Sequence, residues 1–347
     1  AKAGLYWLSG LVVGRDLADW TALRGHPFLI FAFVSFITLL VGLPPFPGFY
    51  AKWELIHHLA GAGRYALLGL ILFGALLEAG YLFRWFGYTI KREQVADPVA
   101  PSVPKRFVIL VAVATGWGLG FVWGELSGHG NLMLAMPMLF AFAFLLLEWL
   151  PAWYKNTFAI GGMVAWFAVS FPGYDPLQVI FGTIILLGGA LILLASYQNT
   201  GRRLGFYPAA MLMYAGLSML IVAEDSFNFF AAWESLTIGS YFLILRGRRS
   251  EPHALAYVLF SLGGAFLIMA GFALAGQGSS QFALAALGEV AAPVAPRVFL
   301  LLAVGFMTKT AAVGLHIWLP GAHAEAETDV SPMVSGILLK AGLFGLF

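Results

Sequence analysis

The sequence FNFFAAWESLTIGSYFLIL at residues 227–245 is apolar along its whole length except for one acidic residue, Glu234. Two later runs have the same character. VFLLLAVGFMTKTAAVGLHIWL at 298–319 contains Lys309, and VSPMVSGILLKAGLFGLF at 330–347 contains Lys340. At about 1.5 Å per residue, a charge roughly ten residues into such a run lies near the centre of a bilayer. Because a charge is costly there, the runs predict membrane-spanning helices with a translocation path.

The composition is that of a membrane protein. Of the 347 residues, 61% are hydrophobic and 10% are charged, with a mean hydropathy of +0.86, whereas soluble domains carry roughly a quarter charged residues. Cysteine is absent, which excludes disulfides and cysteine-ligated iron–sulfur clusters. HExxH and GxSxG motifs are absent too. We expect no cofactor, no metal site and no catalytic redox centre in this chain. The basic residues do not indicate nucleic-acid binding.

Hydropathy predicts an all-α, polytopic transmembrane helix bundle with about thirteen spanning segments. The expected segments are 1–14, 27–43, 46–62, 65–90, 106–124, 131–150, 157–172, 177–197, 206–223, 227–245, 254–275, 296–317 and 330–347. The sequence begins and ends inside apolar runs, so we expect it to be part of a longer protein.

The basic residues indicate the topology. When the segments alternate sides, one side collects Lys91, Arg92, Lys105, Arg106, Lys155, Arg202, Arg203, Arg246, Arg248 and Arg249. The opposite side has only Arg15, Arg24, Arg64 and Arg297. By the positive-inside rule the first side is cytoplasmic. We expect an integral protein of a prokaryotic inner membrane.

Two long motifs carry a resemblance. AEDSFNFFAAWESLTIGSYFLIL at 223–245 resembles the fourth-to-fifth helix region of antiporter-like subunits, and KTAAVGLHIWLPGAHAEAETDVSPMVSGILLKAGLFGLF at 309–347 resembles their seventh and eighth helices. Such subunits occur in respiratory complex I, membrane-bound hydrogenases and Mrp-type cation/proton antiporters. The resemblance implies inverted-topology repeats with interrupted helices.

The start of the chain resembles a different part of the same family. AKAGLYWLSGLVVGRDL at 1–17 is similar to the tenth helix, and LLVGLPPFPGFYAKWELI at 39–56 to the interrupted twelfth helix. The resemblance therefore divides the chain into the last helices of one module, 1–124, an outer-side link, 125–130, and the first eight helices of a second module, 131–347. A natural fusion and two neighbouring polypeptides joined together both fit this order.

The resemblance implies roles for the buried charges. Glu234 pairs with Lys309, and breaking that pair sends a proton to Lys340, the central carrier. Lysine suits this role because burial can bring its pKa near neutrality, whereas arginine stays charged. The alternatives are a static ion pair between helices for Glu234 and Lys309, and a snorkelling side chain for Lys340.

Histidines and acidic residues lie between the two lysines. His316 and His323 either pass protons across that gap or only make interfacial hydrogen bonds. The acidic residues that follow, Glu325, Glu327 and Asp329, form either a proton entrance on the cytoplasmic side or a solvated acidic loop.

Two further lysines complete the candidate set. Lys52 follows PPFPGFYA, and broken helices at membrane depth usually line a wet cavity. The resemblance makes Lys52 the outer end of a path, and the alternative is an interfacial lysine paired with Glu54. Lys2 matches a tenth-helix lysine of the family. Outside this set, Glu224 and Asp225 are expected to cap the helix that starts near Phe227.

We therefore expect a membrane subunit that translocates protons, or exchanges them for Na⁺, and that is driven by a redox complex of the quinone oxidoreductase or hydrogenase type. Its partners would be other membrane subunits, the lipid bilayer, H⁺ and Na⁺. One alternative is an Mrp-type secondary antiporter without redox coupling. Another is a non-conducting scaffold subunit, in which fixed partners neutralise the buried charges.

Overall fold

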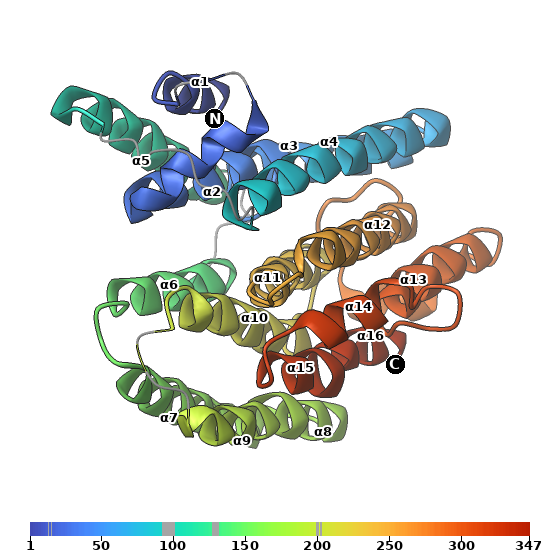
Figure 1. Ribbon diagram of the computed structural model, residues 1–347. Coiled ribbons are helices and arrows are strands. Elements are labelled where there is room, and N and C mark those ends of the chain that lie inside the picture. Colours follow the sequence, from blue (N-terminus) through green and yellow to red (C-terminus); the bar gives the residue numbers. More distant parts are fainter. Residues whose placement is uncertain (13, 15, 92–100, 127–131, 199–200, 202) are drawn as a thin grey trace. The chain divides into compact units, whose positions relative to one another are not determined.

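The computed structural model (Figure 1) describes residues 1–12, 14, 16–91, 101–126, 132–198, 201 and 203–347. Over these residues the regular secondary structure is helical, and one isolated antiparallel bridge pairs Asp225 with Ala283. The predicted all-α class is confirmed. The predicted link at 125–130 lies, from residue 127 onward, outside the described residues.

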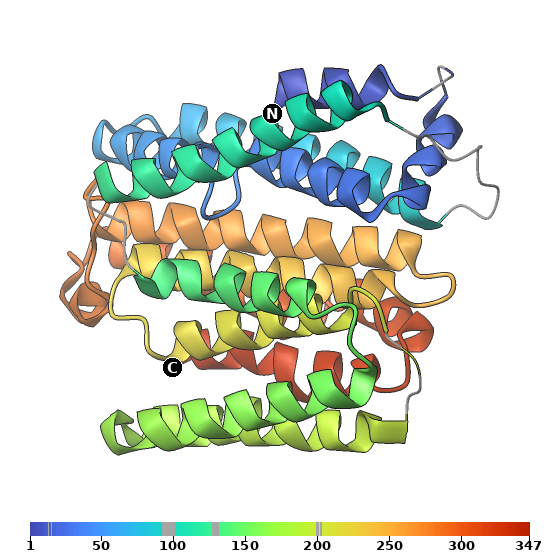
Figure 2. The same ribbon diagram turned by 90° about the vertical axis from the view of Figure 1, so that its left-hand side faces the viewer.

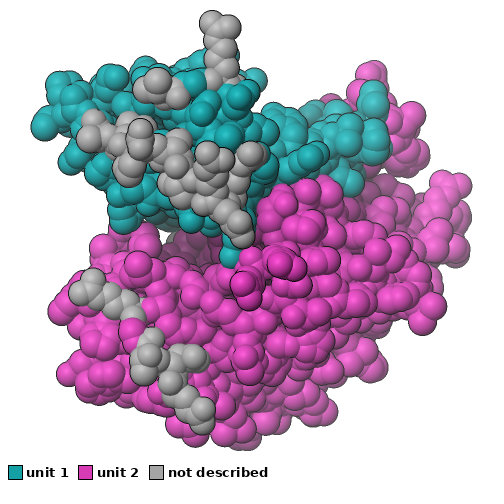
Figure 3. Space-filling model, in the orientation of Figure 1, with its two compact units in different colours: residues 1–55, 69–131 teal, residues 56–68, 132–347 magenta. Residues whose placement is uncertain are grey.

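The chain divides into two compact units, coloured separately in Figure 3. The first comprises residues 1–55 and 69–131, and the second comprises residues 56–68 and 132–347. The helices that lie wholly or mostly in the first unit are α1 (Lys2–Ser9), a 3₁₀ segment (Leu17–Gly25), α2 (Pro27–Val41), α3 (Pro47–Gly61), α4 (Tyr65–Lys91) and α5 (Val103–Leu126).

The second unit contains the three charged runs. Its helices are α6 (Leu132–Leu146), α7 (Ala152–Ser170), α8 (Pro176–Gly182), α9 (Gly188–Ala195), α10 (Phe206–Ile221), α11 (Ser226–Leu245), α12 (Glu251–Ala275), α13 (Ala295–Lys309), α14 (Trp318–Glu325), α15 (Val330–Pro332) and α16 (Leu339–Leu346). One π-helical segment (Thr183–Leu187) joins α8 to α9, and a second (Met333–Leu338) joins α15 to α16. Within this unit α7 and α9 lie side by side (Figure 2).

Helix length and composition support a polytopic membrane bundle. In the described part of the chain, four helices are long and apolar enough to cross a membrane, namely Tyr65–Lys91, Val103–Leu126, Pro176–Ala195 and Glu251–Ala275. Shorter apolar helices occupy Pro27–Val41, Met136–Leu146, Phe206–Ile221 and Val330–Leu346. Each of these helices overlaps a segment predicted from hydropathy.

The predicted segment 296–317 is not one continuous helix. α13 ends at Lys309, and the backbone of Ala311 (φ +55°) and of Gly314 (φ +90°) turns through the left-handed region before α14 begins. Hydropathy misses this break because most of the residues within it are apolar. The indole N–H of Trp318 donates to the carbonyl of Thr308 at 3.1 Å, so one carbonyl at the broken end is satisfied. The break places Lys309 at a helix C-terminus, where the helix dipole favours a cation.

α11 begins where the sequence indicated. The Asp225 carboxylate accepts a hydrogen bond from the Asn228 backbone N–H at 2.8 Å. The predicted N-cap is confirmed, and it fixes the start of the helix that carries Glu234.

Glycines allow the helices around the buried charges to approach closely. A Cβ atom at Gly239 of α11 would lie 2.5 Å from the Met213 backbone nitrogen of α10, and one at Gly216 of α10 would lie 2.7 Å from the Leu236 nitrogen of α11. Gly264 of α12 and Gly305 of α13 contact each other's backbone in the same way. Small residues at such crossings are how membrane helices gain contact area.

We expect Gly239→Ala to destabilise the second unit by about 1–3 kcal/mol, because the new methyl group clashes with the backbone of α10. The measurement is the thermal unfolding midpoint of the detergent-solubilised protein. Gly162→Ala is the matched control, since that helical glycine faces open space and alanine favours a helix by about 0.5–1 kcal/mol. Equal shifts in both variants would contradict the close crossing.

Candidate functional site

Three helices meet at the Lys309 side chain, which is 1% exposed. Its ammonium donates to the Thr237 hydroxyl of α11 at 2.9 Å and to the Tyr257 hydroxyl of α12 at 3.0 Å. It also lies 4.9 Å from the centroid of the Tyr257 ring and 5.5 Å from that of the Trp233 ring. Hydroxyl oxygens and aromatic faces both stabilise a cation that has lost its water.

Glu234 lies close to this ammonium on the same helix as Thr237. The side chain is 2% exposed, and it precedes Thr237 by three residues, so both lie on the same side of α11. The carboxylate charge acts on the Lys309 ammonium through space. Glu234 and Lys309 thus lie in the same buried region, and the hydroxyl groups of Thr237 and Tyr257 are the hydrogen-bond partners of the ammonium.

Sequence reasoning missed Thr237 and Tyr257. The available signal for Thr237 was its spacing of three residues from Glu234. Tyr257 gave a weaker signal, since a tyrosine in an apolar run is usually a packing residue with one polar end.

Lys340 lies on the neighbouring helix α16 and is half-buried. A Cβ at Gly342 would lie 2.5 Å from the Phe306 carbonyl oxygen, so α16 runs against α13 close to Lys309. The π-helical segment Met333–Leu338 directly precedes α16. Such segments disturb the regular helix hydrogen bonding and are frequent at functional sites.

Of the two predicted histidines, His316 lies in the α13–α14 connection and His323 lies near the C-terminal end of α14. His316 is exposed in the break after α13, and its Nδ1 accepts from the Gly314 N–H at 3.2 Å. His323 is exposed on α14 and contacts the Ser331 hydroxyl. A third histidine, His253 of α12, was not singled out from the sequence, and its ring lies against Gly321 of α14.

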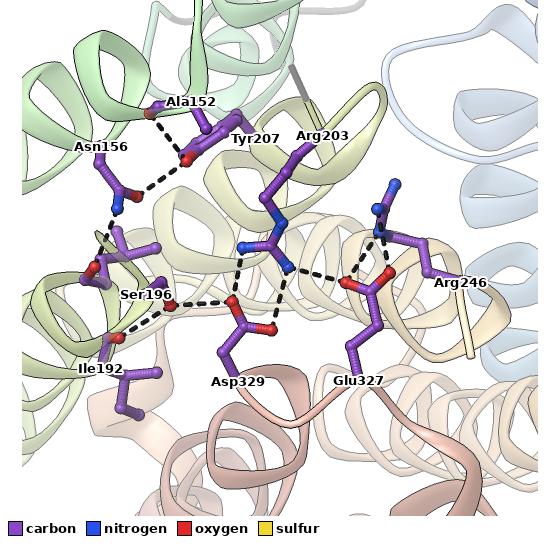
Figure 4. Close-up of polar contacts among 10 residues, drawn as sticks. Ala152, Asn156, Ile192, Ser196, Arg203, Tyr207, Arg246, Glu327 and Asp329 are labelled. Atoms are coloured by element: carbon purple, nitrogen blue, oxygen red, sulfur yellow. Dashed lines mark hydrogen bonds and ion pairs between the residues drawn. The ribbon is translucent and has the colours of Figure 1, made fainter. Parts of the chain in front are cut away.

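The predicted entrance residues Glu327 and Asp329 belong to a compact set of charges, shown in Figure 4. The Arg203 guanidinium donates to Asp329 Oδ2 and Oδ1 at 2.5 and 3.0 Å, and to Glu327 Oε2 at 2.7 Å. Arg246 donates to Glu327 Oε1 at 3.0 Å. We call Arg203, Arg246, Glu327 and Asp329 the arginine–carboxylate cluster.

Burial and hydrogen bonds fix the charge state of this cluster. The side chains of Arg203 and Asp329 are 8% and 12% exposed. Burial alone would raise the pKa of Asp329, but the hydrogen bonds and charge of Arg203, together with the Ser196 hydroxyl at 2.8 Å, hold that pKa below its usual range. Asp329 is therefore ionised at neutral pH, and its carboxylate oxygens accept hydrogen bonds from Arg203 and Ser196. Glu325 lies nearby and accepts from the Arg249 backbone N–H at 3.2 Å.

One lysine that the topology assigned to a loop is buried instead. α7 begins at Ala152, so Lys155 lies in its first turn and is 0% exposed. Its ammonium is 3.5 Å from Glu148 and 4.9 Å from the centroid of the Tyr207 ring. The helix thus begins five residues before the expected apolar segment 157–172, and Glu148 lies beside Lys155 of its first turn.

The first unit holds the two remaining predicted residues. The Lys52 ammonium donates to the Val41 carbonyl at 2.6 Å, and Val41 is the last residue of α2. Lys52 therefore caps the negative end of that helix dipole. Lys2 is exposed at the start of α1.

Comparisons with known proteins agree with the predicted resemblance. Residues 223–347 match the family described as NADH:quinone oxidoreductase/Mrp antiporter, TM. NAD(P)H-quinone oxidoreductase chain 4 2 of Microcystis aeruginosa is 35% identical over 187 residues, which cover 52% of this chain and 33% of that protein. Hydrogenase-4 component B of Escherichia coli is 31% identical over 162 residues, which cover 45% of this chain and 24% of that protein.

A solved structure supports the fold. A chain of respiratory complex I from Thermus thermophilus with bound aureothin matches with a TM-score of 0.52 at 22% identity, covering 62% of this chain and 52% of that one. The chain spans about a third of the length of the curated relatives that it matches first. The resemblance to antiporter-like membrane subunits is confirmed, and the protein is an integral membrane protein.

Because Arg203 lowers the pKa of Asp329, their contact should persist from neutral pH down to the ordinary carboxyl pKa of 3.8, and be lost only below it. The chain has no cysteine, so spin labels on cysteines introduced at Thr328 and Arg248 can report the distance between the loop and the end of α11. We expect one narrow distance distribution from pH 7 down to about pH 4, with broadening only below pH 3.8. Broadening between pH 7 and 6 would contradict the assigned charge state.

Proposed function

We propose that this chain is part of a proton-translocating membrane subunit of a redox-driven complex. Protons move through Glu234, Lys309 and Lys340, with His316 and His323 between the two lysines. The observation that carries the proposal is the Lys309 site, where a fully buried ammonium is held by two neutral hydroxyl groups.

Neutral hydroxyl partners suit a lysine that changes its protonation state. The oxygens of Thr237 and Tyr257 accept from the ammonium. The Thr237 O–H donates to the Trp233 carbonyl at 2.7 Å, so the Tyr257 O–H is the group that can donate to the lone pair of the neutral amine. Both states of Lys309 therefore keep hydrogen bonds. A scaffold would instead neutralise the lysine by direct contact with a carboxylate, which favours only the charged state. The Glu234 charge, acting from a short distance, is then available to shift the balance between the two states.

The names of the relatives support the redox assignment. They are described as chains of NAD(P)H-quinone oxidoreductase and as a component of hydrogenase-4. By analogy the chain would assemble with other membrane subunits in a bacterial inner membrane, and electrons would pass through those partners. The matched family also includes Mrp antiporters, so exchange of protons for Na⁺ without redox coupling is the rival that the experiment must separate.

The two compact units fit two successive modules. We assign residues 1–124 to the end of one antiporter-like module and residues 131–347 to the beginning of the next. Lys52 and Lys2 lie in the first unit, whereas Lys309 and Lys340 lie in the second. Lys52 and Lys2 would then serve a different path from the one through Lys309.

The test uses the intact complex that contains this chain, reconstituted in proteoliposomes with pH- and Na⁺-sensitive dyes. Lys309→Gln and Lys340→Gln should each lower proton uptake at least about tenfold, because general acid–base groups contribute roughly 10²–10⁴-fold. Arg297→Gln is the matched control, an exposed charge at the other end of α13. Unchanged uptake in both lysine variants would favour a scaffold, and Na⁺ movement without a redox substrate would favour an Mrp-type antiporter.

Tyr257→Phe tests the hydroxyl contribution separately. The variant keeps the ring but removes one hydrogen bond from the buried ammonium, which is worth about 1.5–3 kcal/mol for a charged donor. We expect proton uptake to fall about tenfold while the complex still assembles. Tyr65→Phe, at an exposed position, is the control. Proton uptake at the wild-type rate in Tyr257→Phe would show that the Tyr257 hydroxyl does not contribute to proton transfer.

A further inference from the structure

We propose that Arg203 is a positioning residue for Lys340. Through the arginine–carboxylate cluster it joins the end of the helix that carries Glu234 to the segment that leads into the helix that carries Lys340. The inference rests on the proposed function, because it describes how a change at Glu234 affects Lys340 in the same proton path.

The cluster gathers four parts of the second unit at one point. Arg203 lies three residues before the start of α10, and Arg246 immediately follows α11. Glu327 and Asp329 lie in the connection between α14 and α15. Ser196, directly after α9, donates to Asp329 at 2.8 Å and to the Ile192 carbonyl at 3.0 Å. Figure 4 shows the Arg203 guanidinium between the two carboxylates.

Arg203 is held in its place at a cost to the backbone. Its φ angle is +48°, in the left-handed region that residues other than glycine seldom adopt. The guanidinium makes a bidentate contact with Asp329 and also lies 3.7 Å from the centroid of the Phe206 ring. A residue that keeps an unfavourable backbone conformation is over-determined by its surroundings, so its position is well defined.

The balance of charges makes the four side chains of the arginine–carboxylate cluster depend on one another. Two guanidinium groups face two carboxylates, and Glu327 bridges both arginines. Removing any one member leaves an unpaired charge in a site where Arg203 and Asp329 are nearly buried. The cluster therefore has an intact state and a broken state, with few favourable arrangements between them.

The positions of the helices connect this cluster to the buried charges. Along α11, Arg246 lies roughly 18 Å beyond Glu234, at about 1.5 Å per residue. Asp329 lies roughly 16 Å before Lys340 along the segment formed by α15, the π-helical segment and α16. A shift of α11 caused by a change of charge at Glu234 reaches Arg246, and the cluster passes it to the segment before Lys340. Coupling of this kind requires a two-state element that both sites bias.

The first experiment measures backbone hydrogen exchange in the intact complex at constant pH. Arg203→Gln should raise the exchange of amides in residues 326–338 about tenfold, since it frees the segment that the cluster anchors. Arg248→Gln, an exposed arginine beside the cluster, should leave these amides unchanged. Arg203→Lys keeps the charge but loses the bidentate contact, and should fall between the two. Wild-type exchange in Arg203→Gln would overturn the inference.

The second experiment measures protons moved per electron in proteoliposomes. Arg203→Gln should lower this ratio at least twofold while the redox rate is retained, and Asp329→Asn should do the same. The double variant should be no worse than either single variant, because residues that act as one unit are not additive. Faster exchange with a wild-type ratio would mean that the cluster only fastens the loop, and would also overturn the inference.

The two proposals can fail separately. A wild-type ratio in Lys340→Gln would count against the proposed function. In that case the exchange experiment would still decide whether Arg203 positions residues 326–338.

Discussion

Burying the Lys309 ammonium is the constraint on which the second unit depends. A lysine that is 1% exposed needs hydrogen-bond acceptors, and these come from α11 and α12 rather than from its own helix. Three helices must therefore approach closely at one depth. The mutual backbone contacts of Gly216 with α11, Gly239 with α10, and Gly264 with Gly305 make that approach sterically allowed. The close packing of α11, α12 and α13 and the hydrogen bonds of the Lys309 ammonium therefore depend on each other.

The interruption after Lys309 serves the same constraint. An unbroken helix to residue 317 would bond its own carbonyls and leave the lysine at mid-helix. The observed end at Lys309 exposes carbonyl groups, favours a cation there, and brings α14 back so that Trp318 can donate to Thr308. The π-helical segment before α16 is a second departure from regular helix in this region. Irregular backbone at membrane depth is tolerated where protein surrounds it or where it lines a wet cavity.

The charges of this unit fall into two groups with different electrostatics. Lys309 is held by neutral hydroxyls, with the Glu234 carboxylate acting through space. Asp329 and Arg203 are held by direct contacts that fix both charges, since the contacts lower the pKa of Asp329 and raise that of Arg203 against the effect of burial. The role of proton carrier proposed for Lys309 needs neutral hydrogen-bond partners. The positioning role proposed for Arg203 needs charges that are fixed by direct contact.

Hydropathy is a local property, and for that reason the sequence alone determined the all-α class and the approximate positions of the apolar segments. Local signals also sufficed for the Asp225 cap. Long motifs carried the resemblance to antiporter-like subunits. The break after Lys309 was hidden because most of its residues are apolar. The start of α7 at Ala152 was hidden as well. A lysine at residue 155 suggests a loop by hydropathy alone, and its contact with Glu148 is visible only in the structure.

Only the tertiary structure decided the partners of the charges. The hydroxyls of Thr237 and Tyr257 are 72 and 52 residues away from Lys309 in the chain. Arg203 lies 126 residues from Asp329. Contacts between positions so far apart depend on which helix faces pack together, and no local pattern encodes that choice.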